Sequence, residues 1–572
     1  MAATAPPLRS VEREITSTAR VRSRAGLLAV CALTILAVAV HGYHPYAEDG
    51  GLYLAGIKRV LHPELYPYWS GFTTAHLRFS LFAPIVASLV RASHLSLMGV
   101  MLLLYISSIW ATLFAAWQIA IRCYSRMEEC LGAVTLLALL LTVPVAGTSL
   151  MLMDPYVSAR SISTPCSLFA LLAANDLVRQ VRGRERVAAK TAMLCFGALF
   201  LAALVHPLMG AYALGCVLVL AIAEHSDNRL QWAACGAICL VAVAVAVLLL
   251  VFAPETPPGY MEVARTRTYW FLSQWHWYEM AGLVAPLMVL GFIRFRTRNI
   301  SAQTVKSFAR MGLIVGALSI VIAVLFARGA MSRYTVAKLQ PLRVFQTVYV
   351  ITIISVGAFL GESLLKRRVW RWGSMVAGIG AVMLFVQLSA FANSSHLEFP
   401  WVPPSNGWEQ AFTWIKIHAP VNAVFALDAE YITAPGEDSQ NFRAIAERSV
   451  IPDYSKDGGI ASIAPDLTAD WLDGESAQKG LDRASDVDRL RALHAFPVQW
   501  VVLSSAAVTA FPCDYVNRAA KVCRVPTGLR YSATAAHSHS PFLPGFMSSA
   551  RRIECRNTGF ALAGNLDLLC TF

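Results

Sequence analysis

The chain has 572 residues, of which 56% are hydrophobic and only 15% are charged. Soluble proteins average about 45–50% apolar and 25% charged residues, so this composition excludes an ordinary soluble enzyme and indicates an integral membrane protein. The formal charge of +13 does not indicate a nucleic-acid partner, because most clustered Lys and Arg residues lie in short segments between apolar runs. Basic segments in those places orient helices across a bilayer.

Long apolar runs separated by charged segments predict membrane-spanning helices rather than a β-barrel. We predict eleven crossings, at residues 25–42, 97–121, 129–150, 162–178, 190–205, 208–224, 231–253, 277–293, 308–328, 344–362 and 371–392. Residues 1–24 precede the first crossing, residues 25–392 form the transmembrane domain, and residues 393–572 have the composition and length of one water-soluble domain. The run at 190–224 is too long for one helix, so His206-Pro207 is taken as the turn of a helical hairpin.

Five basic segments are expected to face the cytoplasm. They contain Arg9, Arg13, Arg20, Arg22 and Arg24, then Arg122 and Arg126, then Arg179, Arg182, Arg184, Arg186 and Lys190, then Arg294, Arg296, Arg298 and Lys306, and finally Lys366, Arg367, Arg368 and Arg371. The first apolar run lacks a clear cleavage site and is read as a permanent anchor. Residues 79–90 are expected to form a re-entrant or interfacial helix, because counting them as a crossing would invert every later basic segment. We therefore predict a multi-pass protein of the inner (plasma) membrane, with a cytoplasmic N-terminus and an extracytoplasmic C-terminal domain.

The first external loop, residues 43–96, contains two adjacent carboxylates just beyond the first apolar run. Its sequence "YHPYAEDGGLYLAGIKR" (residues 43–59) includes Glu48 and Asp49. A loop of this length is usually functional or disordered, and this one is too apolar for disorder. An isolated acidic pair often only solvates a helix end, so the other residues on the same face decide its interpretation.

The same face is expected to hold a second acid and several cations. Asp154 and Arg160 lie in "LMDPYVSARSISTP" (residues 152–165), and His206 lies at the next outer turn. The last outer loop contributes Arg333, Lys338 and Arg343. Carboxylates beside cations suit the transfer of a group from an anionic lipid carrier, because a carboxylate takes the proton of an acceptor hydroxyl while Arg and Lys stabilise the departing phosphate. Arg160, His206, Arg333, Lys338 and Arg343 are therefore predicted to bind the donor phosphate.

This arrangement resembles the GT-C superfamily of membrane glycosyltransferases, which use polyprenyl-phosphate sugars and include the protein O-mannosyltransferases and aminoarabinose transferases. The segment "HPYAED" (residues 44–49) resembles the His-Pro-acid-acid start of the related lipid-linked mannosyltransferases. The resemblance implies that Asp49 or Glu48 is the catalytic base and that Asp154 is a second external acid. It also leaves open a divalent cation, Mg²⁺ or Mn²⁺, on Asp49 and Asp154, although the second site reads Asp-Pro-Tyr instead of a paired acid.

The C-terminal domain is predicted to be α/β. Helical patterns at 406–419 and 486–496 alternate with strand patterns at 422–428 and 498–504. Two local disulfides, Cys513 with Cys523 and Cys555 with Cys570, are compatible with an oxidising compartment. The mixed charges of residues 435–459 either contact an acceptor glycan or form structural ion pairs. They include Glu437, Asp438, Arg443, Arg448 and Lys456.

The residues favour transfer of a group from an anionic lipid carrier, and the resemblance implies that a sugar moves from a polyprenyl-phosphate donor to a hydroxyl of a glycan, lipid or protein acceptor. A transporter or flippase is the first alternative, but the apolar runs are almost free of charge and show no repeated halves. A non-catalytic subunit of envelope polysaccharide assembly is the second alternative. The sugar and the acceptor stay open.

Overall fold

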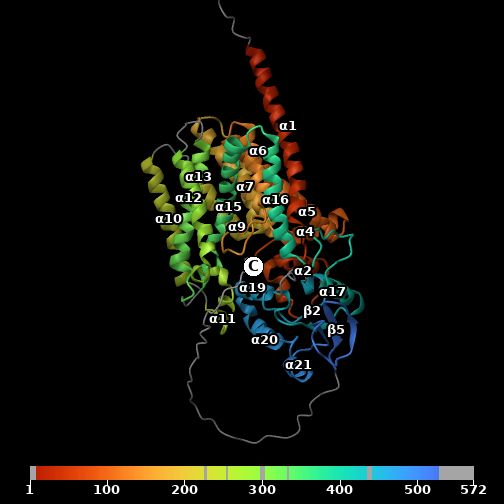
Figure 1. Ribbon diagram of the computed structural model, residues 1–572. Coiled ribbons are helices and arrows are strands. Elements are labelled where there is room, and N and C mark those ends of the chain that lie inside the picture. The colour runs from red at the N-terminus through yellow and green to blue at the C-terminus, as the bar shows by residue number, and fades with distance from the viewer. Residues whose placement is uncertain are drawn as a thin grey trace, which may run out of the picture.

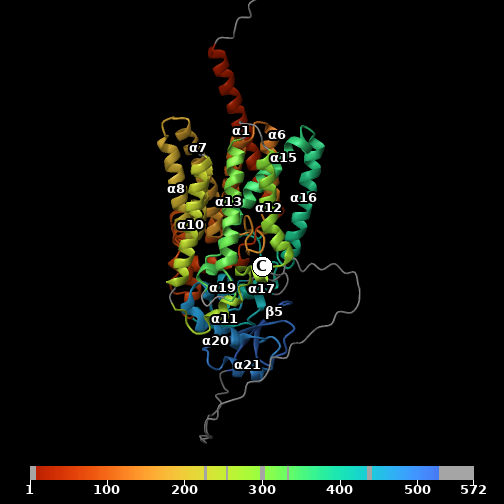
Figure 2. The ribbon, with the colours of Figure 1, turned by 90° about the vertical axis from the view of Figure 1, so that its left-hand side faces the viewer.

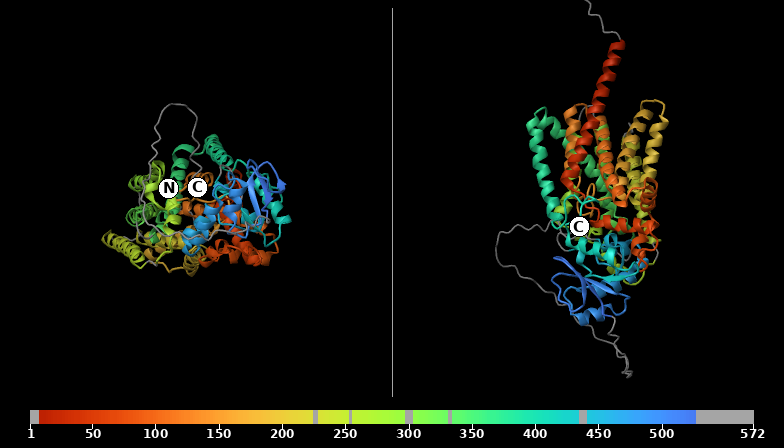
Figure 3. Two further views of the ribbon diagram at one scale, coloured as in Figure 1. Left: turned by 90° about the horizontal axis from the view of Figure 1, so that it is seen from below. Right: turned by 90° about the vertical axis from the view of Figure 1, so that its right-hand side faces the viewer.

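The computed structural model describes residues 8–223, 228–252, 255–296, 303–330, 334–433 and 441–526. Its long helices form a bundle, and a smaller C-terminal domain (described residues 393–433 and 441–526) lies at one end of it (Figure 1). Figure 2 shows the long helices side by side, and the side view in Figure 3 places the C-terminal domain at the same end. The N-terminal part of α1 projects past the other end of the bundle (Figure 1).

A helix lies over each of the eleven predicted crossings. These helices are α1 (Leu8–His41), α5 (Leu97–Cys123), α6 (Met127–Leu139), α7 (Ala159–Arg182), α8 (Ala189–Val205), α9 (Pro207–Ala223), α10 (Asn228–Val251), α12 (Trp277–Arg296), α13 (Gln303–Phe326), α15 (Phe345–Leu360) and α16 (Val369–Ala390). Among the described residues, seven helical segments are long and apolar enough to span a membrane, or eight if one bent pair counts as a span. The chain is thus polytopic, while the count of eleven remains a prediction.

Helix α6 is shorter than the run that predicted it. The apolar run extends to residue 150, but the helix has 13 residues and ends at Leu139. At 1.5 Å per residue α6 is about 20 Å long, less than the roughly 30 Å of a hydrocarbon core. The following segment reverses at a bridge between Pro144 and Met151 and stays largely buried. This turn brings Asp154 to the end of the bundle that faces the C-terminal domain.

The first loop folds into short helices between α1 and α5. They are α2 (Glu48–Leu61), α3 (Gly71–Thr74), η1 (Ala75–Arg78) and α4 (Phe82–Ser93). Residues 71–78 and α4 are bent by 99° relative to each other, as in a broken span or a re-entrant loop. The expected short helix at 79–90 is therefore present, although the bend fits either description. The remaining short elements of the transmembrane part are α11 (Tyr260–Arg265), η2 (Thr268–Trp270), η3 (Leu272–Gln274), α14 (Thr335–Lys338), η5 (Pro341–Val344) and η6 (Gly361–Leu365).

The C-terminal domain contains a five-stranded mixed sheet. Its strands are β1 (Val424–Ala426), β2 (Ser449–Val450), β3 (Trp500–Ser504), β4 (Cys513–Val516) and β5 (Ala520–Arg524), in the order β2-β1-β3-β5-β4. Strand β1 is parallel to β2 and β3, whereas β5 is antiparallel to β3 and β4. Its helices are α17 (Gly407–His418), η7 (Tyr431–Thr433), α18 (Phe442–Ala446), α19 (Lys456–Ile463), η8 (Pro465–Leu467), α20 (Thr468–Gln478) and α21 (Asp486–Leu493). All four predicted elements of this domain are present.

One of the two predicted disulfides is present. Cys513 and Cys523 form a disulfide that joins β4 to β5. Cys555 and Cys570 lie outside the described residues, as do Glu437 and Asp438.

The C-terminal domain is docked on the first loop by polar contacts. Lys58 of α2 donates to the carbonyl of Ala444 at 2.6 Å and pairs with Glu447 at 2.7 Å. The hydroxyl of Tyr66 donates to the carbonyl of Arg443 at 2.8 Å. Because these groups are buried or half-buried, they fix how the C-terminal domain sits over α2.

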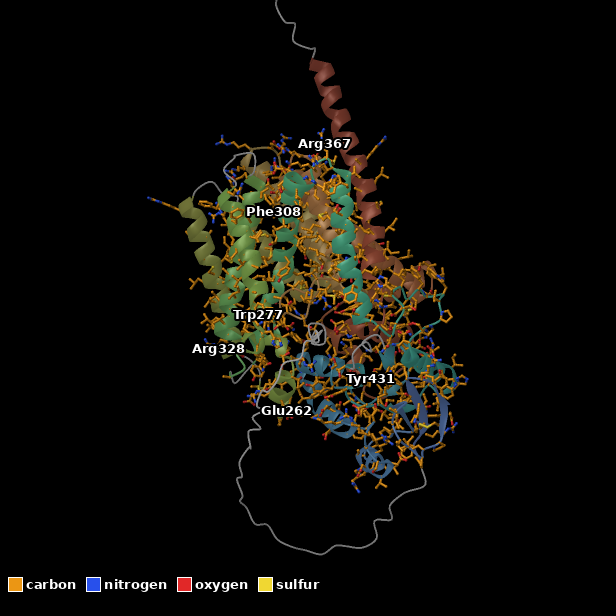
Figure 4. All side chains as sticks on the ribbon, in the orientation of Figure 1. Glu262, Trp277, Phe308, Arg328, Arg367 and Tyr431 are labelled. Atoms are coloured by element: carbon orange, nitrogen blue, oxygen red, sulfur yellow. A yellow bond between two sulfur atoms is a disulfide. The ribbon has the colours of Figure 1, made fainter. Side chains whose placement is uncertain are left out.

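Figure 4 relates the C-terminal domain to one predicted cytoplasmic segment. Tyr431 lies within the C-terminal domain, whereas Arg367 lies at the opposite end of the bundle. Which of these two ends faces the cytoplasm stays a prediction.

Candidate active site

A cavity of about 570 Å³ lies between the helix bundle and the C-terminal domain. It is lined by residues of α2, the turn after α6, the start of α7, the α8–α9 turn, the α14–η5 segment and α19. Seven predicted site residues line it, namely Glu48, Asp49, Asp154, Arg160, His206, Lys338 and Arg343. Arg333, the eighth, lies outside the described residues. Residues from four distant segments are thus brought to one cavity.

Two glycines allow the start of α2 to approach its neighbours closely. A Cβ atom on Gly50 would lie 2.7 Å from the carbonyl oxygen of Pro45 and 3.0 Å from the Tyr156 side chain. A Cβ atom on Gly51 would lie 2.2 Å from Cβ of Asn441 in the C-terminal domain. The "EDGG" sequence therefore combines two carboxylates with the two small residues that let this turn pack between the bundle and the C-terminal domain.

Asp49 and Asp154 share one guanidinium. Arg160 donates from Nη1 to Oδ2 of Asp49 at 2.9 Å, and from Nη2 and Nε to Oδ2 of Asp154 at 3.0 and 3.2 Å. The side chains of Arg160 and Asp154 are 6% and 5% exposed, whereas that of Asp49 is 39% exposed. Within the described part of the chain, Oδ1 of Asp49 has no hydrogen-bond partner. Asp154 is thus a buried partner of Arg160, and Asp49 is the acid with an accessible oxygen.

The same contacts separate the pKa values of the two acids. Burial by itself would raise the pKa of Asp49, but the positive charges of Arg160 and Lys456 outweigh burial and hold the pKa below its usual value. Burial raises the pKa of Asp154, and the nearby negative charge of Asp49 adds to this, although Arg160 opposes both effects. Asp49 is consequently ionised near neutral pH.

Lys456 is a site residue that the sequence analysis did not assign to the site. It lies at the start of α19, lines the cavity, and forms an ion pair with Glu48. Its signal in the sequence is its place in the mixed-charge stretch 435–459, which predicts a glycan contact or a structural ion pair. An ion pair to the acidic turn of the first loop could not be predicted without the docking of the two parts.

The segment that carries Lys456 is held by two arginines. Arg267 donates to the carbonyls of Ser455 and Tyr454 at 2.8 and 3.2 Å. Arg443 donates to both carboxylate oxygens of Asp457 at 2.6 Å, and both of these side chains are buried. These bonds fix the backbone on both sides of Lys456, so its ammonium group is preorganised beside Glu48.

Lys338 and Arg343 also line the cavity. Neither forms an ion pair with a carboxylate of the described residues. The Nζ atom of Lys338 donates to the carbonyl of Ile463 at 3.4 Å, and the Arg343 guanidinium lies 5.8 Å from the ring centre of Tyr269. The Nε atom of Arg343 is buried without a hydrogen-bond partner in the described structure. Together they form a positively charged wall with capacity to bind an anion.

Apolar residues line another part of the cavity. Val205, Leu208 and Ala211 come from the α8–α9 hairpin, which also holds His206, and Leu339 lies beside Lys338. The ring of His206 accepts from the backbone N–H of Met209 at 3.4 Å through Nδ1. His76 also lines the cavity, and both of its ring nitrogens are buried without a hydrogen-bond partner among the described residues. The cavity thus joins an apolar side formed by membrane helices to a polar side formed by α2 and α19.

Three residues that line this cavity have a left-handed backbone conformation. Glu48, Ser149 and Gln340 all line it and have φ angles of 45°, 53° and 51°. Such left-handed conformations are disfavoured for side-chain-bearing residues and persist where the surrounding structure fixes them.

The residues present do not fit a divalent cation held by Asp49 and Asp154. The Arg160 guanidinium bridges one oxygen of each acid and supplies the positive charge that a shared cation would supply. Across the described ranges, no group of three or more His, Cys, Asp or Glu residues is arranged to hold a metal ion. A cation on both acids would require Arg160 to move.

No protein-family model matches the chain, and a search of curated proteins finds no match to it. Among solved structures, the chain is similar to the archaeal oligosaccharyltransferase AglB from Archaeoglobus fulgidus, solved with an inhibitory peptide and a dolichol-phosphate. The identity is 10%, the match covers 84% of this chain and 69% of that chain, and the TM-score is 0.46.

The chain is also similar to the arabinofuranosyltransferase AftD from mycobacteria. The identity is 16%, the match covers 85% of this chain but 35% of that chain, and the TM-score is 0.41. Similarity at this level gives no residue-by-residue correspondence, so the roles of the cavity residues rest on their own geometry.

Proposed function

We propose that this protein is a membrane glycosyltransferase that moves a sugar from a polyprenyl-phosphate donor to an acceptor hydroxyl. The observation that carries the proposal is the composition of one cavity. An ionised carboxylate, two cations without a carboxylate partner among the described residues, and apolar helix residues all border the same space. A lipid-linked phosphate needs all three features, because its tail is apolar, its phosphate is anionic and its sugar must meet a base.

In the proposed step, Asp49 accepts the proton of the acceptor hydroxyl. The acceptor oxygen forms a bond to the anomeric carbon of the sugar as the bond from that carbon to the phosphate oxygen breaks. Polyprenyl phosphate leaves with the bonding electron pair, and Lys338 and Arg343 stabilise its negative charge. The low pKa of Asp49 makes it a weak base, which suits proton transfer that occurs late, when the hydroxyl has become acidic through bond formation.

The other cavity residues position these groups. Arg160 orients Asp49 and neutralises buried Asp154, and Lys456 orients Glu48. Glu48 and Asp49 each have one cationic partner, but the Asp49 side chain is 39% exposed and that of Glu48 is 20% exposed, so Asp49 is preferred as the base. His206 lies at the turn between the apolar helices and the polar cavity, where it contacts the donor near its phosphate. No step is assigned to a metal ion.

The proposal includes an orientation. The cavity and the C-terminal domain lie on the extracytoplasmic side of the inner membrane, and the acceptor is a glycan, lipid or protein of the envelope. The position of Arg367 at the opposite end of the bundle supports this orientation, since basic segments face the cytoplasm (Figure 4).

The test compares Asp49→Asn with a matched control, Glu64→Gln, in the same loop. Glu64 is 63% exposed and does not line the cavity. Each protein is purified, reconstituted in lipid, and given a panel of polyprenyl-phosphate pentoses and hexoses with envelope extract as acceptor. Release of polyprenyl phosphate should fall by about 10²- to 10⁴-fold in Asp49→Asn and stay unchanged in the control.

Two results would contradict the proposal. Full activity of Asp49→Asn would show that Asp49 is not the base. Movement of intact lipid-linked sugar across the bilayer without release of polyprenyl phosphate would identify a flippase instead. Binding of a short-chain polyprenyl phosphate, measured for each variant, verifies that the variant is folded.

A further inference from the structure

A second, larger cavity lies within the C-terminal domain. Its volume is about 1230 Å³, and it shares no lining residue with the candidate active site. Its lining includes Asp428 and Glu430 after β1, Ser504 at the end of β3, and Arg518 in the turn between β4 and β5. Tyr431, labelled in Figure 4, borders it as well. This cavity therefore opens at the carboxyl ends of two neighbouring parallel strands.

The strand order makes this edge of the sheet a characteristic ligand position. From β1 the chain first adds β2 on one side and then returns to add β3 on the other side. The connections that follow β1 and β3 consequently diverge at the carboxyl ends of these strands. Open α/β sheets bind ligands in the crevice formed at such a switch point.

Hydrogen bonds to the backbone brace the walls of the cavity. Asp428 accepts from the backbone N–H groups of Glu430 and Asp482 at 3.1 and 3.2 Å. Asp482 in turn accepts from the backbone N–H of Ser504 at 2.8 Å. In the turn between β4 and β5, Asn517 donates to the carbonyl of Gly407 at 2.7 Å and accepts from the N–H of Ala519 at 2.9 Å. These bonds hold residues 428–430, 482 and 504 together, and they hold residues 407 and 517–519 together.

The exposed groups that border the cavity include both donors and acceptors. Glu430 supplies carboxylate oxygens, while Arg483 and Arg518 supply guanidinium donors. The segment after β1 reads "LDAEYIT", so it carries two acids and no glycine-rich turn. Two acids beside the strand end disfavour a nucleotide phosphate, and the polar walls disfavour a lipid tail.

We propose that this cavity binds an oligosaccharide. Sugar hydroxyls donate and accept hydrogen bonds, so they match walls that offer carboxylates, guanidinium groups and amides together. The volume exceeds the roughly 300–1,000 Å³ of typical small-molecule pockets, which suits a chain of several sugar units. The proposal concerns binding alone, and it does not depend on transfer at Asp49.

The test measures binding of labelled arabinan, mannan, glucan and galactan fragments to the full-length protein in lipid nanodiscs by fluorescence polarisation. The variant is Glu430→Gln with Arg483→Ala, and the matched control is Arg491→Ala on α21. Arg491 is 74% exposed and does not line the cavity. At least one fragment should bind, and the double variant should weaken it about tenfold or more, since hydrogen bonds to two charged groups are lost. The control should bind as the unchanged protein does.

Absence of binding by all four fragments, or equal binding by the double variant and the control, would overturn the proposal. A thermal unfolding midpoint equal to that of the unchanged protein verifies that the double variant is folded. If the double variant is unstable, Arg518→Ala, on the other wall, replaces it in the comparison. Binding measured in Asp49→Asn should be unchanged, which separates failure of this inference from failure of the proposed transfer.

Discussion

Replacement of Arg343 by Ala should weaken binding of the donor phosphate. The Arg343 side chain has no carboxylate partner in the described structure, and its Nε is buried without a hydrogen bond. An anion placed in the cavity would therefore gain a charge-assisted hydrogen bond from a group that has no competing acid. Such a bond contributes about 2 kcal/mol, which corresponds to roughly a 30-fold change in Kd.

The size of the change in Kd distinguishes phosphate binding by Arg343 from an interaction of Arg343 with the membrane surface. An arginine that only extends its charge toward the headgroups would contribute nothing to ligand affinity. Arg343→Lys keeps the charge but loses the planar pair of donors, so its effect should lie between those of the unchanged protein and Arg343→Ala. Lys338 supplies a second charge, so Arg343→Ala should weaken binding without abolishing it.

The assay is binding of a short-chain polyprenyl phosphate to protein in nanodiscs, measured by isothermal titration calorimetry. Arg296→Ala is the matched control, because the Arg296 guanidinium also lies 5.8 Å from an aromatic ring centre, that of Phe292, but outside the cavity. The control should bind as the unchanged protein does. Equal affinity of Arg343→Ala and Arg296→Ala would refute the assignment of Arg343 to the phosphate.

Four further outcomes are expected. Lys456→Met should move the acid limb of the pH profile of kcat/KM to higher pH, because Asp49 acts in its ionised form and the Lys456 charge that lowers its pKa is removed. An acid limb at the same pH would argue against Asp49 as the base. Arg160→Met should lower the free energy of unfolding by about 3–5 kcal/mol, because it leaves buried Asp154 unpaired. Arg78→Met removes a half-exposed pair with Asp466 and should lower it by at most about 1 kcal/mol. Equal shifts of the two thermal unfolding midpoints would contradict this expectation. Transfer should survive EDTA, because Arg160 bridges the two acids, and a loss restored by Mg²⁺ or Mn²⁺ would show that a cation is needed. Single cysteines near Asp49, Asp154, His206 and Lys338 should react with an impermeant maleimide from outside, whereas those near Arg184 and Arg296 should not. Labelling of the Asp49 and Asp154 positions from opposite sides of the membrane would exclude a single site.

Local patterns predicted much of the helix bundle. Helices lie over all eleven apolar runs, because backbone groups in a bilayer must be satisfied within the segment itself. The same reasoning failed for residues 140–150, where the predicted crossing continues as a buried turn past the end of α6. Hydropathy reports burial, and a turn packed inside the protein is as apolar as a helix.

The candidate site was only partly predictable. A shared outer face suggested that Glu48, Asp49, Asp154, Arg160, His206, Lys338 and Arg343 would meet, and all of them line one cavity. The sequence could not predict which of the adjacent residues Glu48 and Asp49 has the side chain more accessible to solvent. Glu48 pairs with Lys456 and Asp49 pairs with Arg160 because the two side chains point to different neighbours.

The sequence by itself determined the membrane character of the chain, the positions of its helices and the group of polar residues on one face, since these follow from local composition and charge. Tertiary structure decided the pairing of those residues. Lys456 reaches Glu48 only because the C-terminal domain docks on α2, and Gly51 admits Asn441 at the same contact. Residues several hundred positions apart pair because whole helices and strands pack against one another, and local composition does not predict that packing.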